Sequence, residues 1–199
     1  MKKILIISLL TCLIYASEEF DSIKTEFFKS YDYEQVSKYK EATKVLAPLY
    51  KKNSSNYTLN LRLGWLFSLQ KHYTDAIKYY EKASLIHTKA IEPKLGLARV
   101  YLNSYSYAKA QSMSGEILKL DYYNYYANLY MIRSLIAQKK YTIAIEIIEK
   151  MRTIYPTDVL FLEQLLIAYK QTKNEGYESV YENILLLDPN NVYVRSLKK

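Results

Sequence analysis

The chain has 199 residues, of which 50% are hydrophobic and 24% charged, so it carries enough apolar material for a packed core and is not a disordered tail. Only four Gly and four Pro are present, which disfavours sheet-rich folds with many tight turns and predicts long regular elements. The formal net charge of +8 is spread along the chain rather than gathered in one dense stretch, and we therefore predict no nucleic-acid partner.

The first residues have the features of a secretory signal peptide. Two lysines follow the initiator methionine, an apolar stretch covers residues 4–14, and the small residues Ala16 and Ser17 precede acidic ones. The apolar stretch is shorter than the roughly 20 residues that a bilayer span needs. We predict a signal peptide over residues 1–17, cleaved after about Ala16 or Ser17, and an exported protein, periplasmic or secreted, without a stable membrane span after cleavage.

Two alternatives stay open for this segment. The stretch could remain as an uncleaved N-terminal anchor. Cys12, the only cysteine, lies in a setting that loosely resembles a bacterial lipoprotein attachment site, although Thr11 is not the residue expected before such a cysteine. Removal of the segment leaves a chain without thiols, which excludes cysteine-based zinc sites and cysteine nucleophiles and suits an oxidising compartment.

Two residue types recur through the chain at a spacing of 34. The spacing holds without exception in two ladders: Tyr39, Tyr73, Tyr107 and Tyr141, and Ala42, Ala76, Ala110 and Ala144. Within each period, apolar residues recur at three-and-four spacing in two blocks that a short polar stretch separates. In residues 57–90 that stretch includes Thr74, which we expect to cap the second helix. Each period therefore predicts a helical hairpin.

The best-patterned period contains a characteristic string: Asn60, Leu63, Gly64, Phe67, Ala76, Tyr80 and Ala83. This string resembles the tetratricopeptide repeat (TPR), a helix-turn-helix unit of 34 residues. The resemblance implies an all-α, right-handed α-solenoid over residues 18–199 with about five repeats. Their expected ranges are 23–56, 57–90, 91–124, 125–158 and 159–191, and residues 192–199 could form a capping segment.

The two terminal repeats depart from the pattern. The first has Ser30 at the small-residue position and Pro48 late in its second helix, where a proline can kink or end the helix. In the last repeat we expect one residue fewer between the two helices, with Glu178 or Tyr177 where Ala is expected. Terminal repeats are often atypical because they cap the stack.

No set of residues predicts catalysis. His72 and His87 are both expected in turns, and neither lies at metal-ligand spacing from another strong ligand. The carboxylates fall at helical surface spacing beside lysines, and no phosphate-binding glycine loop is present. We therefore predict that the chain is not an enzyme and holds no cofactor and no metal.

The TPR resemblance also implies a binding surface, since first helices of that family line a concave groove. The residue after the Gly/Ala position gives Tyr31, Trp65, Arg99, Arg133 and Ile167, and neighbouring groove positions give Arg62, Asn103, Tyr126 and Tyr130. Trp, Tyr and Arg most often carry binding energy, and arginines one repeat apart can each take a carboxylate. Our hypothesis is that Trp65, Arg99 and Arg133 form the core of a groove for an extended or helical acidic peptide. The alternative is that Trp65 packs against the neighbouring repeat and the arginines pair with glutamates on their own helices.

The resemblance implies a non-enzymatic protein–protein interaction module. With the signal peptide, it suggests a scaffold or adaptor of the bacterial cell envelope that binds a peptide or protein surface in its concave groove. An alternative is a carbohydrate-binding protein, in which groove aromatics stack on the rings of an envelope polysaccharide while lysines meet its acidic groups. A third is one module of a larger secretion or polysaccharide-export assembly.

Overall fold

The structure is a computed structural model that describes residues 23–197. The expected signal peptide and Cys12 lie outside the described residues. Over residues 23–197 the chain consists of helices and short connections, without a strand. None of the helices in this range is both long and apolar enough to cross a bilayer.

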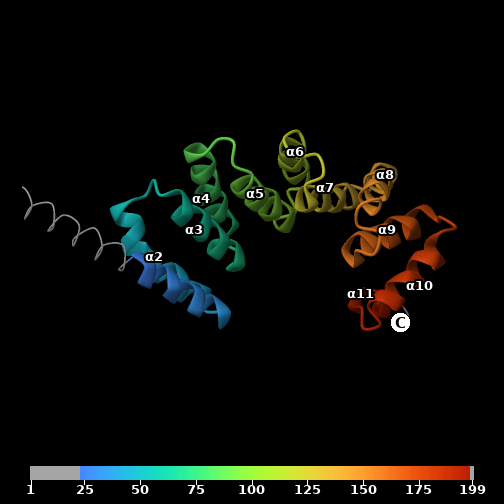
Figure 1. Cartoon of the computed structure of the whole chain (residues 1–199), viewed down its shortest axis with the longest axis horizontal. Coiled ribbons are helices and arrows are strands. Elements are labelled where there is room, and N and C mark those ends of the chain that lie inside the picture. The colour runs from blue at the N-terminus through green and yellow to red at the C-terminus, as the bar shows by residue number, and fades with distance from the viewer. Residues whose placement is uncertain (1–22, 198–199) are drawn as a thin grey trace, which may run out of the picture. The chain divides into compact units, whose positions relative to one another are not determined.

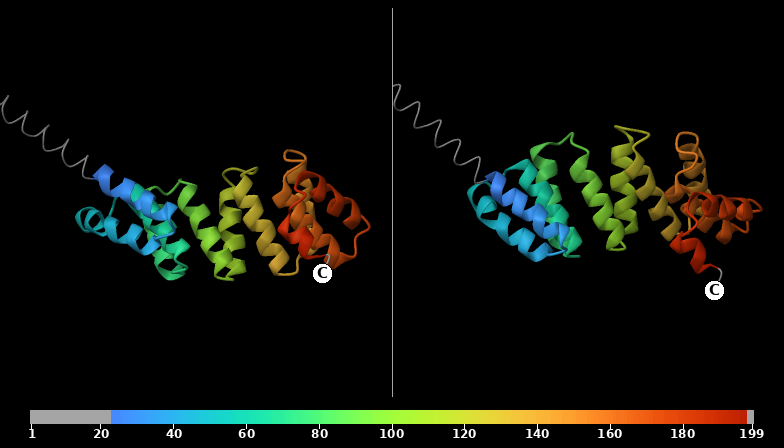
Figure 2. Two further views of the ribbon diagram at one scale, coloured as in Figure 1. Left: turned by 90° about the horizontal axis from the view of Figure 1, so that it is seen from below. Right: turned by 60° about the horizontal axis from the view of Figure 1, so that its bottom comes forward.

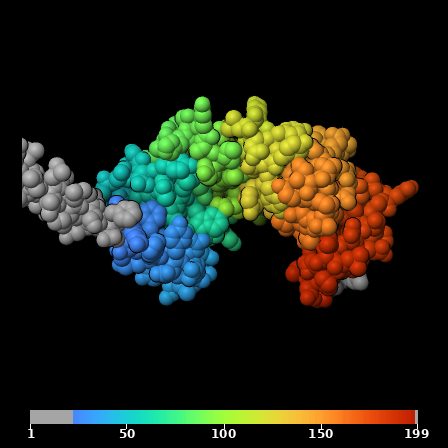
Figure 3. Space-filling model, in the orientation of Figure 1, coloured from blue at the N-terminus to red at the C-terminus, as the bar shows by residue number. Residues whose placement is uncertain are grey.

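The described chain forms two compact units, residues 23–89 (unit 1) and residues 90–197 (unit 2). In unit 1, a helical segment over residues 23–35 precedes α2 (Tyr39–Lys52), α3 (Tyr57–Leu69) and α4 (Tyr73–Ile86). Helix α3 packs against both α2 and α4 (Figure 1). The space-filling view shows the helices of unit 1, blue to green, as one continuous body (Figure 3).

Unit 2 contains three helical pairs and a short final helix. They are α5 (Glu92–Asn103), α6 (Tyr107–Leu118), α7 (Tyr125–Ala137), α8 (Tyr141–Arg152), α9 (Val159–Thr172), α10 (Tyr177–Leu187) and α11 (Val192–Ser196). The first helices of the pairs contact one another, α5 with α7 and α7 with α9, and each also packs against its own second helix. Figure 2 shows α5, α6, α7 and α8 side by side. The first helices of unit 2 therefore form a row.

The two 34-residue ladders mark equivalent places in successive pairs. Each ladder tyrosine is the first residue of a second helix, namely α2, α4, α6 or α8, and all four are half-buried. Each ladder alanine follows three residues later and is fully buried. The prediction of two helices per period is confirmed.

A left-handed residue lies in the turn inside each pair. Positive φ angles of 53 to 60° occur at residues that are again spaced by 34: Ser37, Lys71, Tyr105, Lys139 and Lys173. In the turn between α3 and α4, the N–H groups of Lys71 and His72 donate to the carbonyls of Ser68 and Phe67, at 3.1 and 3.0 Å. This is the Schellman arrangement, which ends a helix through a residue in the left-handed region. None of the five positions is occupied by glycine.

Among the helical pairs, side chains cap the first helices α3, α7 and α9, but not the first helix α5 or any of the second helices α2, α4, α6, α8 and α10. Asn56 accepts from the backbone N–H of Leu59 at the start of α3, and Asn124 accepts from that of Ala127 at the start of α7. Asp158 caps α9 in the same way. The expectation that Thr74 caps α4 is wrong: α4 begins at Tyr73, after an N-cap residue whose side chain makes no cap hydrogen bond. The Schellman turn already directs the chain into this helix.

The terminal pairs differ in part from expectation. Pro48 lies inside α2, which continues to its end at Lys52. The expected shorter connection in the last pair is wrong, because α10 starts four residues after the left-handed Lys173, where the other second helices start two residues after theirs. Val180, three residues into α10 and 6% exposed, takes the alanine position instead of Glu178 or Tyr177. The capping segment contains the short helix α11, whose Val194 is buried in the core of unit 2.

Candidate functional site

A pocket of about 720 Å³ opens within unit 1, between the 23–35 segment, the start of α2 and α3. Its apolar and aromatic lining consists of Tyr31, Tyr39, Leu61, Trp65 and Leu69. Polar side chains, Arg62 and Glu34 among them, complete the wall. Three of the predicted groove residues, Tyr31, Arg62 and Trp65, therefore line one cavity, which we call the Trp65 pocket.

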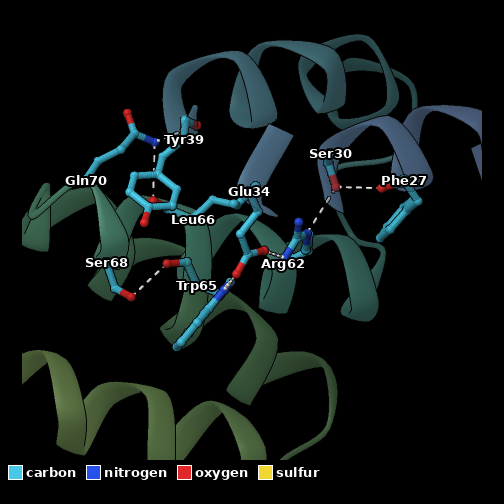
Figure 4. A network of polar contacts seen from close by, with 9 residues as sticks. All are labelled: Phe27, Ser30, Glu34, Tyr39, Arg62, Trp65, Leu66, Ser68 and Gln70. Atoms are coloured by element: carbon cyan, nitrogen blue, oxygen red, sulfur yellow. Dashed lines mark hydrogen bonds and ion pairs between the residues drawn. The ribbon is translucent and has the colours of Figure 1, made fainter. Parts of the chain in front are cut away.

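The carboxylate of Glu34 holds two of these residues together (Figure 4). Its Oε2 accepts from Nη1 of Arg62, and its Oε1 accepts from the indole Nε1–H of Trp65 at 2.5 Å. Nε of Arg62 donates to the hydroxyl of Ser30 at 3.1 Å, and that hydroxyl donates to the carbonyl of Phe27 at 2.7 Å. The side chain of Arg62 is only 6% exposed, so its charge is neutralised inside the protein by Glu34.

Tyr31 covers the other side of the Arg62 cation. The guanidinium carbon lies 3.7 Å from the centroid of the Tyr31 ring, a cation–π contact. Tyr31 itself is 48% exposed, so the ring that shields the guanidinium also faces the solvent. The glutamate that pairs with Arg62 comes from the first helix of the preceding pair, the 23–35 segment. Arg62 thus orders the wall of the pocket and does not present a free cation to a ligand.

The remaining predicted groove residues lie on three successive first helices of unit 2, with Ile167 on α9. Arg99 and Asn103 belong to α5, and Tyr126, Tyr130 and Arg133 belong to α7. The rings of Tyr126 and Tyr130 are 6.1 Å apart between centroids, and Tyr126 is 54% exposed. Burial raises the pKa of Tyr130, and the positive charges of Arg99 and Arg133 oppose that rise. The structure therefore brings two cations and two tyrosines of successive repeats together.

Arg133 makes no hydrogen bond or ion pair with any residue of the described range 23–197, and it is half-buried. The positive charge of Arg133 acts to lower the pKa of Tyr125 and of Tyr130, against the rise that burial causes. Trp65 belongs to unit 1, whereas Arg99 and Arg133 belong to unit 2, so a single groove formed by all three stays a prediction.

The histidines are placed as the sequence predicts. His72 and His87 flank α4, at its N-cap and C-cap positions, and His87 packs edge-on against the Tyr57 ring with centroids 4.7 Å apart. Over the described residues, no group of three or more His, Cys, Asp or Glu side chains is arranged to hold a metal ion.

No protein-family model matches the sequence, and no curated protein matches it. Solved structures match the fold. A tetratricopeptide repeat protein from Parabacteroides merdae superposes with a TM-score of 0.76 at 20% identity, over 88% of this chain and 70% of that chain. The chain has a TPR-like fold. The predicted all-α solenoid class is thereby confirmed.

Two further TPR-like chains match over nearly their whole length. YrrB, a TPR protein with an unusual peptide-binding site, has a TM-score of 0.70 at 14% identity, over 93% of this chain and 96% of that chain. MamA from Desulfovibrio magneticus RS-1, from its residue 41 to its end, has a TM-score of 0.72 at 13% identity, over 90% of this chain and 98% of that chain. At these low sequence identities, the similarity shows a shared fold and nothing more.

Proposed function

We propose that this chain is a non-enzymatic protein–protein interaction module that binds a peptide or a protein surface along its first helices. The observation that carries the proposal is the Trp65 pocket. Three of the predicted groove residues, Tyr31, Arg62 and Trp65, line this one cavity. Ordered aromatic and arginine side chains around a cavity are the usual anchors of protein interfaces. YrrB, which has the same fold, has a peptide-binding site, and this supports the same class of function here.

The first-helix face of unit 2 supplies a second contact surface in this proposal. Arg99 and Arg133 lie one repeat apart around Tyr130, and this arrangement of positive charge fits a segment that carries carboxylates. Because Arg133 has no partner of its own within the described chain, it can accept one without breaking an internal pair.

A capture experiment with matched charge reversals tests the proposal. The biotinylated full chain is used to capture proteins from an envelope extract, and captured proteins are compared with those bound by the double variant Arg99→Glu, Arg133→Glu. The control is Lys119→Glu with Lys139→Glu, which makes the same change of net charge at exposed turn positions of unit 2. We expect the arginine variant to lose at least about 10-fold in affinity for a captured partner. Equal binding by both double variants would exclude the unit 2 face as the contact surface.

We also propose that the module is exported and works in the bacterial cell envelope as a scaffold or adaptor. The support is the lysine pair and the short apolar stretch at the start of the sequence. Mass spectrometry of the N-terminal peptide from fractionated cells tests this location. A mature N-terminus near Ser17 or Glu18 in a periplasmic or secreted fraction is the expected result, and an intact N-terminus in the cytosol would contradict it.

A carbohydrate-binding function is the second candidate, and the Tyr126–Tyr130 pair favours it. The exposed Tyr126 ring stands beside Tyr130 and the cations that surround it, which suits stacking on an acidic sugar polymer. A glycan array separates the two functions: selective binding of acidic polysaccharides that Tyr126→Ala abolishes would favour the polymer, and capture of a protein partner alone would favour the interaction module.

A further inference from the structure

We propose that the Trp65 pocket receives one bulky apolar side chain of the partner, and that acidic residues next to this anchor bind Lys38 and Lys40 at the start of α2. The inference rests on the proposed function and specifies the ligand chemistry of unit 1. It differs from the expectation of a carboxylate in the groove, because here the pocket itself selects against a charged side chain.

The internal pairing of the pocket is the first argument. Both carboxylate oxygens of Glu34 are engaged, one by Arg62 and the other by Trp65. A ligand carboxylate in the pocket would approach Glu34 and would find Arg62 already paired and covered by the Tyr31 ring. Like charges in a partly buried site repel, so an acidic side chain is disfavoured there. A ligand cation would compete with Arg62 for the same carboxylate.

The shape and lining of the pocket are the second argument. Its volume of about 720 Å³ lies in the range of sites that hold a ligand group, and its surface is mainly apolar and aromatic. Leu61, Leu69 and the Trp65 ring are only partly buried by the protein itself. An apolar side chain that enters the pocket removes this surface from water together with its own, and the hydrogen bond to Glu34 keeps the Trp65 ring in place for it.

The charge next to the pocket is the third argument. Tyr39 borders the Trp65 pocket and also a smaller neighbouring pocket of about 350 Å³, whose lining includes Lys38, Lys40 and His72 together with Glu41. Lys38 and Lys40 are both exposed, on either side of Tyr39. Unit 1 as a whole has twelve Lys and Arg residues against six Asp and Glu over residues 23–89. A partner segment with acidic residues beside its apolar anchor is therefore complementary to this face.

A selection from a displayed library of random 12-residue peptides tests the proposal on the full chain. The expected enriched peptides share one Leu, Ile, Met or Phe position with Asp or Glu close to it. Trp65 is the only tryptophan of the chain, so its indole N–H gives a single NMR signal, and a synthetic enriched peptide should shift it. Replacing the apolar anchor with Ala should weaken binding about 10- to 100-fold. Replacing it with Glu should weaken binding at least as much.

Two pairs of variants locate the bound peptide. Thr58 and Thr74 are both exposed second residues of helices, α3 and α4, but only Thr58 lines the Trp65 pocket. Thr58→Phe fills the pocket and should lower affinity at least about 10-fold, whereas the affinity of Thr74→Phe should stay within about twofold of the unchanged chain.

Lys38→Glu with Lys40→Glu should reduce both the affinity and its salt dependence, in contrast to Lys51→Glu with Lys52→Glu at the other end of α2. Thermal unfolding confirms that each variant is folded.

Several outcomes would overturn the inference. Enriched peptides without a common apolar position would do so, as would peptides that bind Thr58→Phe as tightly as the unchanged chain. If such peptides instead lose affinity for the Arg99→Glu, Arg133→Glu variant, the pocket inference fails while the proposed function stands. If no peptide and no envelope protein binds the full chain, the proposed function fails together with the inference.

Discussion

The indole N–H of Trp65 on α3 donates to Oε1 of Glu34 at 2.5 Å, which joins side chains from two successive helical pairs. The second oxygen of the same carboxylate accepts from Arg62. One glutamate therefore positions two residues of the pocket wall, and it is the only acidic group that faces the buried guanidinium within the lining. The positions of the Arg62 and Trp65 side chains in the pocket wall therefore depend on this one carboxylate.

Removing the charge of Glu34 should destabilise unit 1 strongly. In Glu34→Gln the guanidinium of Arg62, 6% exposed, keeps its charge without a carboxylate partner. Losing one partner of a buried pair costs about 3 to 5 kcal/mol, and we expect a loss near 3 because Glu34 is 23% exposed. Adding Arg62→Met should recover part of that loss, since the uncompensated charge is then gone. Urea unfolding followed by circular dichroism measures both variants.

The exposed pair between Glu26 and Lys29 supplies the control for this prediction. It also joins a glutamate of the 23–35 segment to a cation, at 3.0 Å, but its lysine side chain is 52% exposed. Glu26→Gln should therefore cost less than about 0.5 kcal/mol. If Glu34→Gln cost no more than Glu26→Gln, the carboxylate would not be holding the pocket together.

Two glycines in helix interiors should respond in opposite directions to alanine. A Cβ on Gly64 would lie 2.9 Å from ring atoms of Tyr80, whereas a Cβ on Gly115 would meet only the methyl of Met131 at 3.7 Å. Gly64→Ala should destabilise by up to about 2 kcal/mol, because overpacking outweighs the gain of about 1 kcal/mol in helix propensity. Gly115→Ala should stabilise by about 0.5 to 1 kcal/mol. Thermal unfolding measures the stability of both variants. If both were less stable than the unchanged chain, the predicted difference between the two glycines would be refuted.

The repeat architecture could be predicted from the sequence because it depends on spacing alone. The buried alanines lie in the second helices as predicted, whereas α4 starts at Tyr73, inside the stretch that was predicted to be the turn. The last pair was predicted wrongly, because the tyrosine ladder breaks after Tyr141 and the longer turn between Lys173 and Tyr177 leaves no 34-residue marker. The side-chain caps Asn56, Asn124 and Asp158 do follow the 34-residue period, and a search for that period among Asn and Asp would have found them.

The candidate site was predictable only in part. Tyr31, Arg62 and Trp65 were selected by their place in the repeat, and the structure brings them to one pocket. The role of Glu34 could not be predicted, since its two partners lie 28 and 31 residues away and no local pattern links them. Whether an arginine is free or paired depends on such contacts, so the sequence could not distinguish the paired Arg62 from Arg133.

Glycine at a left-handed turn position should stabilise the chain. Lys139 has φ of 60°, in a region where an L-residue with a Cβ is disfavoured. Lys139→Gly should therefore gain about 0.5 to 1 kcal/mol. Lys119→Gly is the matched control, because Lys119 is an exposed lysine at a helix end with φ of −71°, where glycine only adds entropy to the unfolded chain. The two variants should shift the urea midpoint in opposite directions, and a parallel shift would show that the backbone conformation does not matter.

The hydrogen bond between Tyr125 and Asp158 should make the stability of unit 2 fall at high pH. The Tyr125 hydroxyl donates to Oδ2 of Asp158 at 2.9 Å, and burial, followed by this hydrogen bond and the charge of Asp158, raises the pKa of Tyr125 well above its usual value. The unfolded chain therefore releases this proton first, so the stability that it contributes is complete below about pH 10 and is lost as the pH rises further. Tyr125→Phe should be less stable than the unchanged chain at neutral pH by about 1 kcal/mol. Above about pH 10 the stability of Tyr125→Phe should fall less steeply with pH than that of the unchanged chain. The two slopes should differ by up to about 1.4 kcal/mol per pH unit. Urea unfolding between about pH 9 and 11 measures both slopes, and parallel curves for the two proteins would contradict the prediction.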